Sequence, residues 1–415
     1  MTDTNRNWAG NIAYSTGNVE TPRSVLEVQE IVQRSRKVRG LGSRHSFNRI
    51  ADTDGTLLSL RGLNRLVGLD AAAGTATVEG GITYGELAPL LDAQGFALHN
   101  LASLPHISVV GAATTATHGS GNSNQNLATS ISGLEIVTAS GDILTLRRGD
   151  AGFDGAVVGL GALGIVVRAT LDLVPRFEVR QNVYLDLPFA TYVDNFAAIT
   201  GSAYSVSAFT HWSGDSIAHI WLKSLASAPP RSGDFFGARA APKPYHPIET
   251  IDPAPATEQL GVAGPWHERL PHFRMAFTPS VGAELQTEYF VPFSDGPAAL
   301  RALHAIQDRF APHLMVSELR TIAADALWLS MNYRQPSLAF HFTWKPDWPA
   351  VRQVLPAIEA ALTPFGVRPH WGKLFTMDKA MVQSRYERLG DFRALARAHD
   401  PDGKFRNAFV DDYVF

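Results

Sequence analysis

The chain has 415 residues, of which 45% are hydrophobic and 18% charged, and its formal net charge of −3 lacks the basic excess of nucleic-acid-binding proteins. Its length favours two domains, and the absence of cysteine excludes disulfides, thiolate metal ligands and cysteine nucleophiles. No apolar run approaches the roughly 20 residues of a membrane span and no signal-peptide core opens the chain, so we expect a cytoplasmic protein without nucleic-acid or membrane partners.

A helix and several short strands are predicted at the start of the chain. Apolar residues recur at intervals of three and four from Ser24 to Arg36, which is typical of an amphipathic helix. Further elements follow in order: strands at Val38 to Leu41, Thr56 to Leu60, Leu66 to Leu69 and Thr75 to Glu79, and a helix from Tyr84 to Gln94. The first part of the chain is therefore expected to be α+β.

The turn within Val38 to Asn48 combines glycines with hydroxyl side chains. Gly40 and Gly42 permit backbone conformations closed to other residues, so that successive N–H groups converge on an anion. Further donors of the kind that a diphosphate needs are Ser43, Arg44 and Ser46. An ordinary strand-to-loop connection with a surface histidine, His45, explains these residues equally well.

A block without any charged residue extends from Leu98 to Asn126. Small residues and hydroxyls dominate it, which suits backbone packed closely against a flat, polar ligand. A tightly packed core turn of glycine and alanine is the alternative. We favour a ligand because the block is both long and polar.

The run from Gly159 to Gly164 matches the GxGxxG pattern of dinucleotide-binding folds. That pattern must open a helix, whereas these glycines lead into a β-branched strand from Ile165 to Val174. We therefore reject a Rossmann fold and expect a loop that lies against the same ligand. Ahead of this loop, Ile131 to Ser140 and Ile143 to Leu146 are predicted to form a hairpin.

The pattern of the sequence changes after Pro175, and we place a domain boundary there. A passage rich in proline and glycine runs from Ala228 to Pro271, and its length indicates either a functional covering loop or a flexible excursion. The remaining predicted elements are strands at Ala218 to Leu222, Gln286 to Phe293, His313 to Thr321 and Leu338 to Trp344, and helices at Pro297 to Phe310 and Tyr386 to His399.

Four stretches together resemble the vanillyl-alcohol-oxidase type of FAD-dependent oxidoreductase, and within it the alditol (xylitol) oxidases. They are Arg39 to Asn48, Ser103 to Gly121, Gly161 to Val166 and His399 to Asn407. The resemblance implies an α+β fold with a two-subdomain FAD-binding domain of this (PCMH) type and a substrate cap domain whose large antiparallel sheet is flanked by helices. It implies an FAD-binding domain at residues 1–175 and 376–415 and a cap at residues 176–375.

The resemblance further implies an FAD bonded covalently through His45 to the 8α-methyl group of the isoalloxazine. The other residues that it implies for cofactor binding are Gly40, Leu41, Gly42, Ser43, Arg44, Ser46, Ser103, Ser108, Gly111, Thr115, Thr117, His118, Gly121, Ile165 and His370.

A polyol pocket is also implied. Its substrate-binding residues would be Ser103, Gln286, Glu318, Arg320, Thr343 and Lys373. Glu318 and Arg320 are two residues apart and therefore share one face of a strand, as His341 and Thr343 do on theirs. Taken singly, Glu318 and Arg320 are explained as a surface ion pair and His341 as a hydrogen-bonded sheet histidine. Their joint occurrence in the family's order favours the pocket.

The activity implied is oxidation of the terminal primary alcohol of an alditol such as xylitol or sorbitol to the aldose. A hydride passes from C1 to flavin N5, and O2 is reduced to hydrogen peroxide. We expect Lys373, helped by His341 and Glu318, to polarise or deprotonate the hydroxyl, because a lysine in a partly desolvated pocket has a lowered pKa. Arg320 belongs to the same catalytic set.

The expected partners are the small polyol and O2, the expected state is a monomer, and no metal is expected. Two other functions stay open, namely an aldonolactone oxidase or dehydrogenase of the same superfamily and a nonenzymatic carbohydrate-binding protein. A metal hydrolase is disfavoured because the 14 histidines show no HxxEH or HxH spacing.

Overall fold

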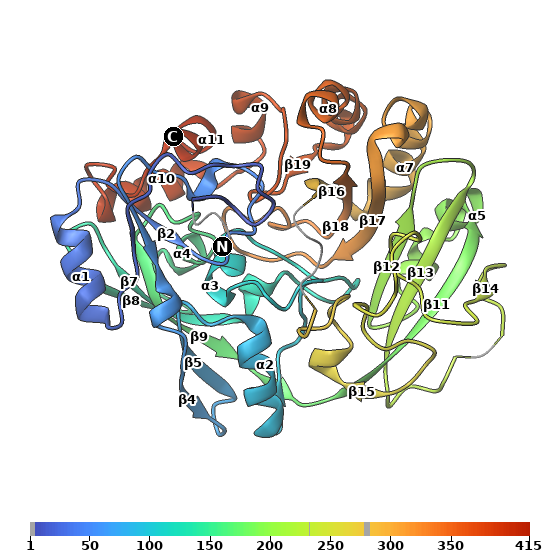
Figure 1. Cartoon of the computed structure of the whole chain (residues 1–415), viewed down its shortest axis with the longest axis horizontal. Helices are drawn as coiled ribbons and strands as arrows, with labels where there is room; N and C mark the ends of the chain where they lie inside the picture. Colours follow the sequence, from blue (N-terminus) through green and yellow to red (C-terminus); the bar gives the residue numbers. More distant parts are fainter. Residues whose placement is uncertain (1–4, 232, 278–282) are drawn as a thin grey trace.

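The protein is described by a computed structural model that covers residues 5–231, 233–277 and 283–415. Residue 232 of the predicted proline- and glycine-rich passage, and residues 1–4 of the predicted FAD-binding domain, lie outside these ranges. Within the described ranges the strands form four sheets, and helices lie largely on the outside of them (Figure 1).

Small sheets form the first part of the chain. One is parallel, with the order β1-β3-β2, and consists of β1 (Val19–Glu20), β2 (Val38–Leu41) and β3 (Thr56–Ser59). Another is antiparallel, with the order β4-β5-β9-β7-β8, and consists of β4 (Leu66–Asp70), β5 (Thr75–Glu79), β7 (Ile131–Val137), β8 (Ile143–Arg147) and β9 (Ile165–Asp172). A short pair joins β6 (Phe96–Ala97) to β10 (Val174–Pro175).

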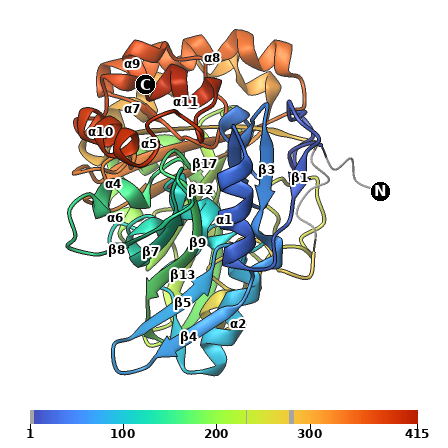
Figure 2. The same cartoon turned by 90° about the vertical axis from the view of Figure 1, so that its left-hand side faces the viewer.

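Helix α1 (Val25–Arg34) lies against both larger sheets of this part (Figure 2). Its apolar face shares one buried cluster with Val38 of β2 and Val167 of β9. The side chain of Ser24 accepts a hydrogen bond from the backbone N–H of Glu27 and so caps the helix. The predicted helix is confirmed, and it ends two residues before the expected end.

The glycines of the GxGxxG match precede a strand, as predicted. Strand β9 begins at Ile165, directly after Gly164, whose φ of 148° is open to glycine and strained for other residues. Helix α2 (Tyr84–Ala93) also forms where it was expected, and it begins with a capping box between Thr83 and Glu86.

A nine-stranded antiparallel sheet dominates the second part of the chain. Its order is β14-β11-β13-β12-β17-β18-β16-β19, with β15 also paired to β11. The strands are β11 (Glu178–Pro188), β12 (Ser205–Thr210), β13 (Ser216–Leu225), β14 (Arg239–Ala240), β15 (Gly264–Pro265), β16 (Leu285–Pro292), β17 (Leu314–Ile322), β18 (Ser337–Trp344) and β19 (Arg368–Pro369).

Helices cover the outer face of this sheet (Figure 1). They are α5 (Phe189–Asp194), α6 (Phe196–Thr200), α7 (Gly296–His304) and α8 (Trp348–Leu362). The side chain of Tyr289 on β16 points to this face and donates a hydrogen bond of 2.8 Å to Glu359 of α8. The expected α+β fold with a large sheet flanked by helices is confirmed.

The remaining helices lie within or after the charge-free block, or follow the nine-stranded sheet in the chain. They are α3 (Val109–Thr114), α4 (Phe153–Val157), α9 (Lys379–Gln383), α10 (Leu389–His399) and α11 (Ala408–Tyr413). Helix α10 contacts α4, and α11 contacts the 3-10 turn at Arg49–Ala51. Among the described residues, no helix combines the length and the apolar character that crossing a bilayer requires.

Two predicted helices begin or end at other residues than expected. The helix expected from Pro297 to Phe310 stops at His304, because Ile306 leaves the helical conformation and short 3-10 turns lead into β17. The last predicted helix begins at Leu389 rather than at Tyr386.

The chain leaves the five-stranded sheet at Asp172 and enters the nine-stranded sheet at Glu178. It leaves that sheet for the last time after β19 and then continues into α9. The predicted domain boundaries, at residues 175 and 375, fall in these two connections, and the division remains our proposal.

Candidate active site

A cavity of about 460 Å³ lies between the turn after β2 and the inner face of the nine-stranded sheet. This volume is within the range of small-molecule sites in proteins. The predicted residues that line it are Gly40, Leu41, Gly42, Ser43, Arg44, His45, Ser46, Ser103, Ser108, Gly111, Thr115, Thr117, His118, Gln286, Glu318, Arg320, His341, Thr343, His370 and Lys373. Residues separated by more than 300 positions in sequence therefore share one cavity.

Two predicted cofactor residues lie elsewhere. Ile165 lines a smaller cavity of about 150 Å³, which shares Gly42 and Gly111 with the first. Gly121 lines neither cavity. Its N–H donates to the carbonyl of Thr321 at 2.8 Å, and it bridges to Ile322. This glycine joins the charge-free block to β17, and its assignment to the cofactor remains a prediction.

The turn after β2 packs closely on the start of α3. A Cβ atom at Gly42 would lie 2.6 Å from Oγ of Ser108, and one at Gly111 would lie 2.5 Å from the same oxygen. The backbone N–H of Ser108 donates to Ser43 Oγ at 3.2 Å. Oγ of Ser108 is itself buried without a hydrogen-bond partner in the described protein. The small residues of both segments thus leave polar atoms facing the cavity, as expected for a site that holds a polar ligand.

Arg39 fixes three segments beside this turn. Its buried guanidinium donates to the carbonyls of Leu160 at 2.9 Å, Gly161 at 3.2 Å and Phe405 at 2.7 Å. Burial lowers the pKa of Arg39 to about 10, and Asp400 opposes this shift. The strand, the glycine loop and the C-terminal segment are therefore held together by one cation.

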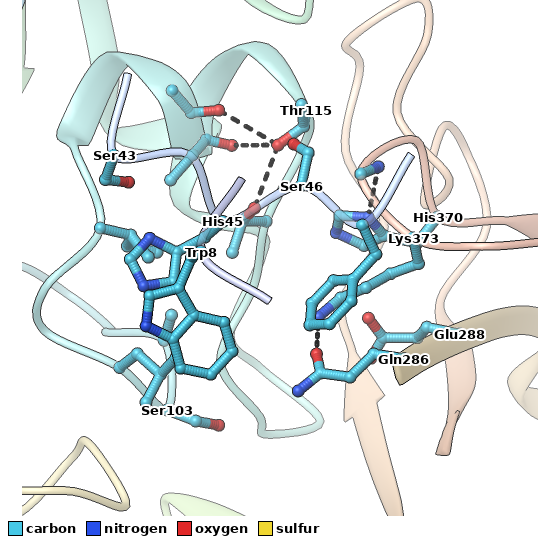
Figure 3. Close-up of a pocket in the computed structure, with 18 of the residues that line it drawn as sticks. Trp8, Ser43, His45, Ser46, Ser103, Thr115, Gln286, Glu288, His370 and Lys373 are labelled. Carbon is cyan, nitrogen blue, oxygen red and sulfur yellow. Dashed lines mark hydrogen bonds between the residues drawn. The ribbon is translucent and has the colours of Figure 1, made fainter. Parts of the chain in front are cut away.

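His45 is placed at the edge of the cavity with its ring stacked on Trp8 (Figure 3). The ring centroids are 5.1 Å apart, with an interplanar angle of 23°. Both ring nitrogens are shielded from solvent and make no well-aligned hydrogen bond in the described protein. Burial, followed by the charges of Lys373 and His106, lowers the pKa of His45 to about 4, against a smaller opposing effect of the Ser43 backbone. His45 is therefore a neutral imidazole near neutral pH.

The opposite wall of the cavity is a row of side chains across three neighbouring strands. Glu288 on β16 is paired in register with His341 on β18, which is paired with Glu318 on β17. The pairing of Gln286 with Thr343 forms the next row. Side chains in these rows share one face of the sheet, so the predicted common orientation of the i, i+2 pairs is confirmed.

Glu318 and Arg320 are not a surface ion pair, since they are only 5% and 7% exposed. Arg320 donates to Glu288 at 2.8 Å, and its Nε lies 3.6 Å from Glu318. Although burial disfavours ionisation of Glu318, Arg320 and His272 outweigh it and hold its pKa far below the usual range. The alternative of a solvated pair is wrong.

Glu288 was not identified from the sequence. Its carboxylate lies 3.2 Å from Nε2 of His118 and accepts the hydrogen bond of Arg320. These two groups overcome the effect of burial and hold the pKa of Glu288 well below its usual range. The signal was present, because Glu288 stands two residues after Gln286, the same spacing that pointed to the other pairs.

Lys373 and His341 both contact one oxygen of Gln286. Figure 3 shows Lys373 and Gln286 side by side. The ammonium donates to Oε1 of Gln286, and Nε2 of His341 lies 3.1 Å from the same atom. Lys373 also stands 4.9 Å from the ring centroid of Phe47. Burial above all, with a contribution from Arg320, lowers the pKa of Lys373 to about 8, and Glu288 opposes this shift. Burial and the charge of Lys373 lower the pKa of His341 to about 3.

The turn after β2 also fixes the backbone of Lys373. The side-chain amide of Asn48 donates to the carbonyls of Trp371 at 2.8 Å and Lys373 at 2.7 Å. One turn therefore carries His45 and holds the backbone of the lysine on the far side of the cavity.

The proline- and glycine-rich passage covers part of the cavity. The passage contributes the lining residues His246, Pro247, Ile248, Ile251 and Pro255. Next to its end, His272 lies with Nε2 2.7 Å from Oε1 of Glu318. The geometry favours the covering loop, and no local motif pointed to His272.

Comparison with known proteins relates this site to a family. The FAD binding domain family matches residues 18–147, and the D-arabinono-1,4-lactone oxidase family matches residues 282–413. An alditol oxidase of Streptomyces sp. (strain IKD472 / FERM P-14339) is 46% identical over 411 residues, which are 98% of each chain. The chain belongs to the alditol oxidase family.

Other relatives place this alditol oxidase family member in a wider group. An L-gulono-1,4-lactone dehydrogenase of Mycobacterium tuberculosis (strain ATCC 25618 / H37Rv) is 27% identical over 422 residues, or 97% of each chain. Cholesterol oxidase from B. sterolicum is 14% identical but superposes with a TM-score of 0.81 over 99% of this chain and 96% of its own. This likeness concerns the fold alone; the vanillyl-alcohol-oxidase type is confirmed by the alditol oxidase relative together with the FAD binding domain match.

As an alditol oxidase family member, the protein is an FAD-dependent oxidoreductase. The described residues fit the cofactor: the closely packed glycine turn, the unpartnered oxygen of Ser108 and the unpartnered nitrogens of His45 all face the cavity. In such an enzyme the cofactor would supply the redox chemistry, and the protein would bind and orient the reactants around it.

Proposed function

We propose that this protein oxidises the terminal primary alcohol of alditols such as xylitol and sorbitol to the aldose, with transfer of the C1 hydride to flavin N5 and reduction of O2 to hydrogen peroxide. The observation that carries the proposal is the close pairing of charges on the sheet wall. Lys373 and Arg320 stand among the carboxylates of Glu284, Glu288 and Glu318, so the wall presents hydrogen-bond donors and acceptors side by side. Such a wall suits a substrate with many hydroxyls and no charge of its own.

Within this wall we assign proton removal to Lys373. A general base works best when its pKa is near the working pH. Lys373, with a pKa of about 8, meets this condition, whereas His341, with a pKa of about 3, is a weak base. The pKa of Glu318 is also held far below its usual range, so its carboxylate is better suited to accept a hydrogen bond from a substrate hydroxyl. The other hydroxyls of the substrate are oriented by Arg320, Ser103, Gln286 and Thr343.

Covalent attachment of FAD to His45 is part of the same proposal. A neutral imidazole with an available ring nitrogen is the form that bonds to a carbon centre, and the lowered pKa of His45 favours this form. In acid-precipitated protein the yellow flavin should stay in the pellet, and in a His45→Ala variant it should pass to the supernatant. Full release from the wild-type protein would refute the covalent bond.

Anaerobic spectroscopy of the purified protein tests the main proposal. Addition of xylitol or sorbitol should bleach the flavin band, and readmission of oxygen should restore it and produce hydrogen peroxide. A protein without a flavin band would instead be a carbohydrate-binding protein. A flavin band that neither polyol bleaches refutes the alditol assignment.

A second candidate is an aldonolactone oxidase or dehydrogenase. It is favoured by the match of residues 282–413 to the D-arabinono-1,4-lactone oxidase family. Lactones also carry hydroxyls and no charge, so the paired donors and acceptors of the wall do not separate the two substrates. Stopped-flow reduction with xylitol and with L-gulono-1,4-lactone, compared at equal concentration, decides between them.

The proposal also includes a monomeric, cytoplasmic enzyme without nucleic-acid or membrane partners. Light scattering on the holoenzyme checks the monomer, and cell fractionation checks the location.

A further inference from the structure

Lys223 is a completely buried cation that does not line the cavity. It stands on β13, and its side chain is 0% exposed. Its ammonium group contacts three acceptors, the carbonyl of Leu270, the carbonyl of Pro271 at 2.9 Å and Nδ1 of His272 at 3.1 Å. An ammonium group has three hydrogens, so each hydrogen has one partner. Burial of an unpaired charge is costly, so a lysine buried in this way needs a physical reason.

His272 connects this buried cation to the cavity wall. Its Nδ1 faces Lys223, and its Nε2 lies 2.7 Å from Oε1 of Glu318. When the ammonium donates to Nδ1, that nitrogen carries a lone pair, and the ring proton is on Nε2. Nε2 then donates to the Glu318 carboxylate, so all contacts in the chain of three residues are attractive.

The same geometry disfavours the arrangement in which Lys223 is neutral and the ring proton of His272 is on Nδ1. Burial lowers the pKa of Lys223 well below its usual value, although Glu318 opposes this. A neutral Lys223 would accept the proton of Nδ1 and leave a lone pair of Nε2 against the Glu318 carboxylate at 2.7 Å. A protonated Glu318 would relieve that repulsion, but Arg320 beside it favours the ionised form; a second proton on His272 would also relieve it, but burial of the ring disfavours that charge.

The segment that carries His272 also fixes a second predicted substrate residue. The backbone N–H groups of His272 and Phe273 donate to the carbonyl of Ser103 at 3.1 and 3.2 Å. Lys223 holds this segment through the two preceding carbonyls. The buried cation thereby supports both Glu318 and Ser103 on one side of the cavity.

We propose that Lys223 is a positioning residue: it holds His272 as the neutral Nε2–H tautomer and so presents Glu318 as a fixed, ionised acceptor for a substrate hydroxyl. The second part of this statement rests on the proposed polyol oxidation. The first part concerns only the protein and can be tested without substrate.

The charged and titratable groups around His272 define the expected response. Lys223 faces it from β13, and Glu318 and Arg320 face it from β17. Burial, together with the charges of Lys223 and Arg320, lowers the pKa of His272 to about 4, against the effect of Glu318. Removal of the Lys223 charge should therefore allow His272 to become an imidazolium at higher pH, where it would neutralise Glu318.

Nitrogen NMR of the holoenzyme labelled at histidine tests the first part. The signals of His272 are assigned by their loss in His272→Gln. In the wild type they should show the neutral Nε2–H tautomer at pH 6 to 8, whereas in Lys223→Met the titration midpoint should rise by at least one pH unit. An Nδ1–H tautomer in the wild type, or an unchanged midpoint in the variant, overturns the proposal.

Matched substitutions at His272 test the second part in anaerobic flavin reduction by xylitol. A glutamine side chain at this position keeps an N–H donor toward Glu318, so His272→Gln should retain the xylitol Kd within about threefold, and His272→Leu should raise it at least tenfold. His219→Leu replaces a buried histidine of β13 outside the cavity lining and should leave the Kd unchanged. Equal Kd values for the glutamine and leucine variants overturn the proposal, even if Lys223→Met does not fold. If xylitol fails to reduce the wild-type flavin, the proposed function fails, and the NMR experiment alone decides the role of Lys223.

Discussion

The rate of flavin reduction should depend on pH through the ionisation of Lys373. A lysine acts as a base only in its neutral form, and burial lowers the pKa of this group from 10.5 to about 8. At pH 7 the neutral fraction is then about one-tenth, compared with roughly 0.03% for an unperturbed lysine. Because the pKa is lowered, the active form accumulates as pH rises through 8. The rate constant at saturating xylitol should increase about tenfold between pH 7 and pH 10 and then level off.

Anaerobic stopped-flow measurements between about pH 6 and pH 10 check this expectation. Two variants at this position give matched controls: Lys373→Met removes the charge, and Lys373→Arg keeps a cation that stays protonated over this range. Both should retain the flavin, lose the pH-dependent rise and reduce the flavin at least 100-fold more slowly. Rescue by arginine would assign Lys373 an electrostatic role. A flat wild-type profile would refute the reasoning, because it is the result expected when His341 or Glu318, with their lower pKa values, is the base.

Three further predictions concern binding and stability. Gln286→Leu removes the oxygen shared by Lys373 and His341 and should weaken xylitol binding about tenfold, or ~1.4 kcal/mol; an unchanged Kd in equilibrium binding to the oxidised enzyme would exclude a substrate role. Glu288→Gln removes the buried charge that accepts the hydrogen bond of Arg320 and should lower the free energy of unfolding in urea by about 3 kcal/mol. A loss below about 1 kcal/mol is what a solvated pair would give. Gly121→Ala places a Cβ 2.4 Å from the carbonyl oxygen of Tyr204 at a φ of 134° and should lower the melting temperature by several degrees. Gly17→Ala is the control, because no atom lies within 4 Å of the new Cβ, and it should leave the melting temperature unchanged. Equal melting temperatures for the two variants would contradict the close approach at Gly121.

The parts of the site that lie on strands could be predicted because strand geometry is local. Glu318 and Arg320 share a face by their spacing alone, and so do His341 and Thr343, as the register of β17 and β18 bears out. The rejection of a Rossmann fold was equally local, since the residues after Gly164 are β-branched.

The contacts that escaped prediction are distant in sequence. Lys223 and His272 are 49 positions apart, and His272 and Glu318 are 46 apart. No periodicity encodes such a meeting, because it depends on how the loop before β16 folds back over the sheet. Helix α3 was missed for another reason: its small residues give no apolar repeat from which a helix could be read.

The hydrogen bonds of Asn48 and Arg39 have a consequence for the order in which the protein is built. Asn48 holds the carbonyl of Lys373, 325 positions later, and Arg39 holds that of Phe405, 366 positions later. The ribosome synthesises the turn after β2 early and its distant hydrogen-bond partners, Lys373 and Phe405, near the end. Until residue 405 has emerged, the nascent chain carries the turn without the contact of Arg39 to Phe405. Loading and attachment of FAD should therefore follow synthesis of nearly the whole chain, and polypeptides stalled before Phe405 should remain colourless.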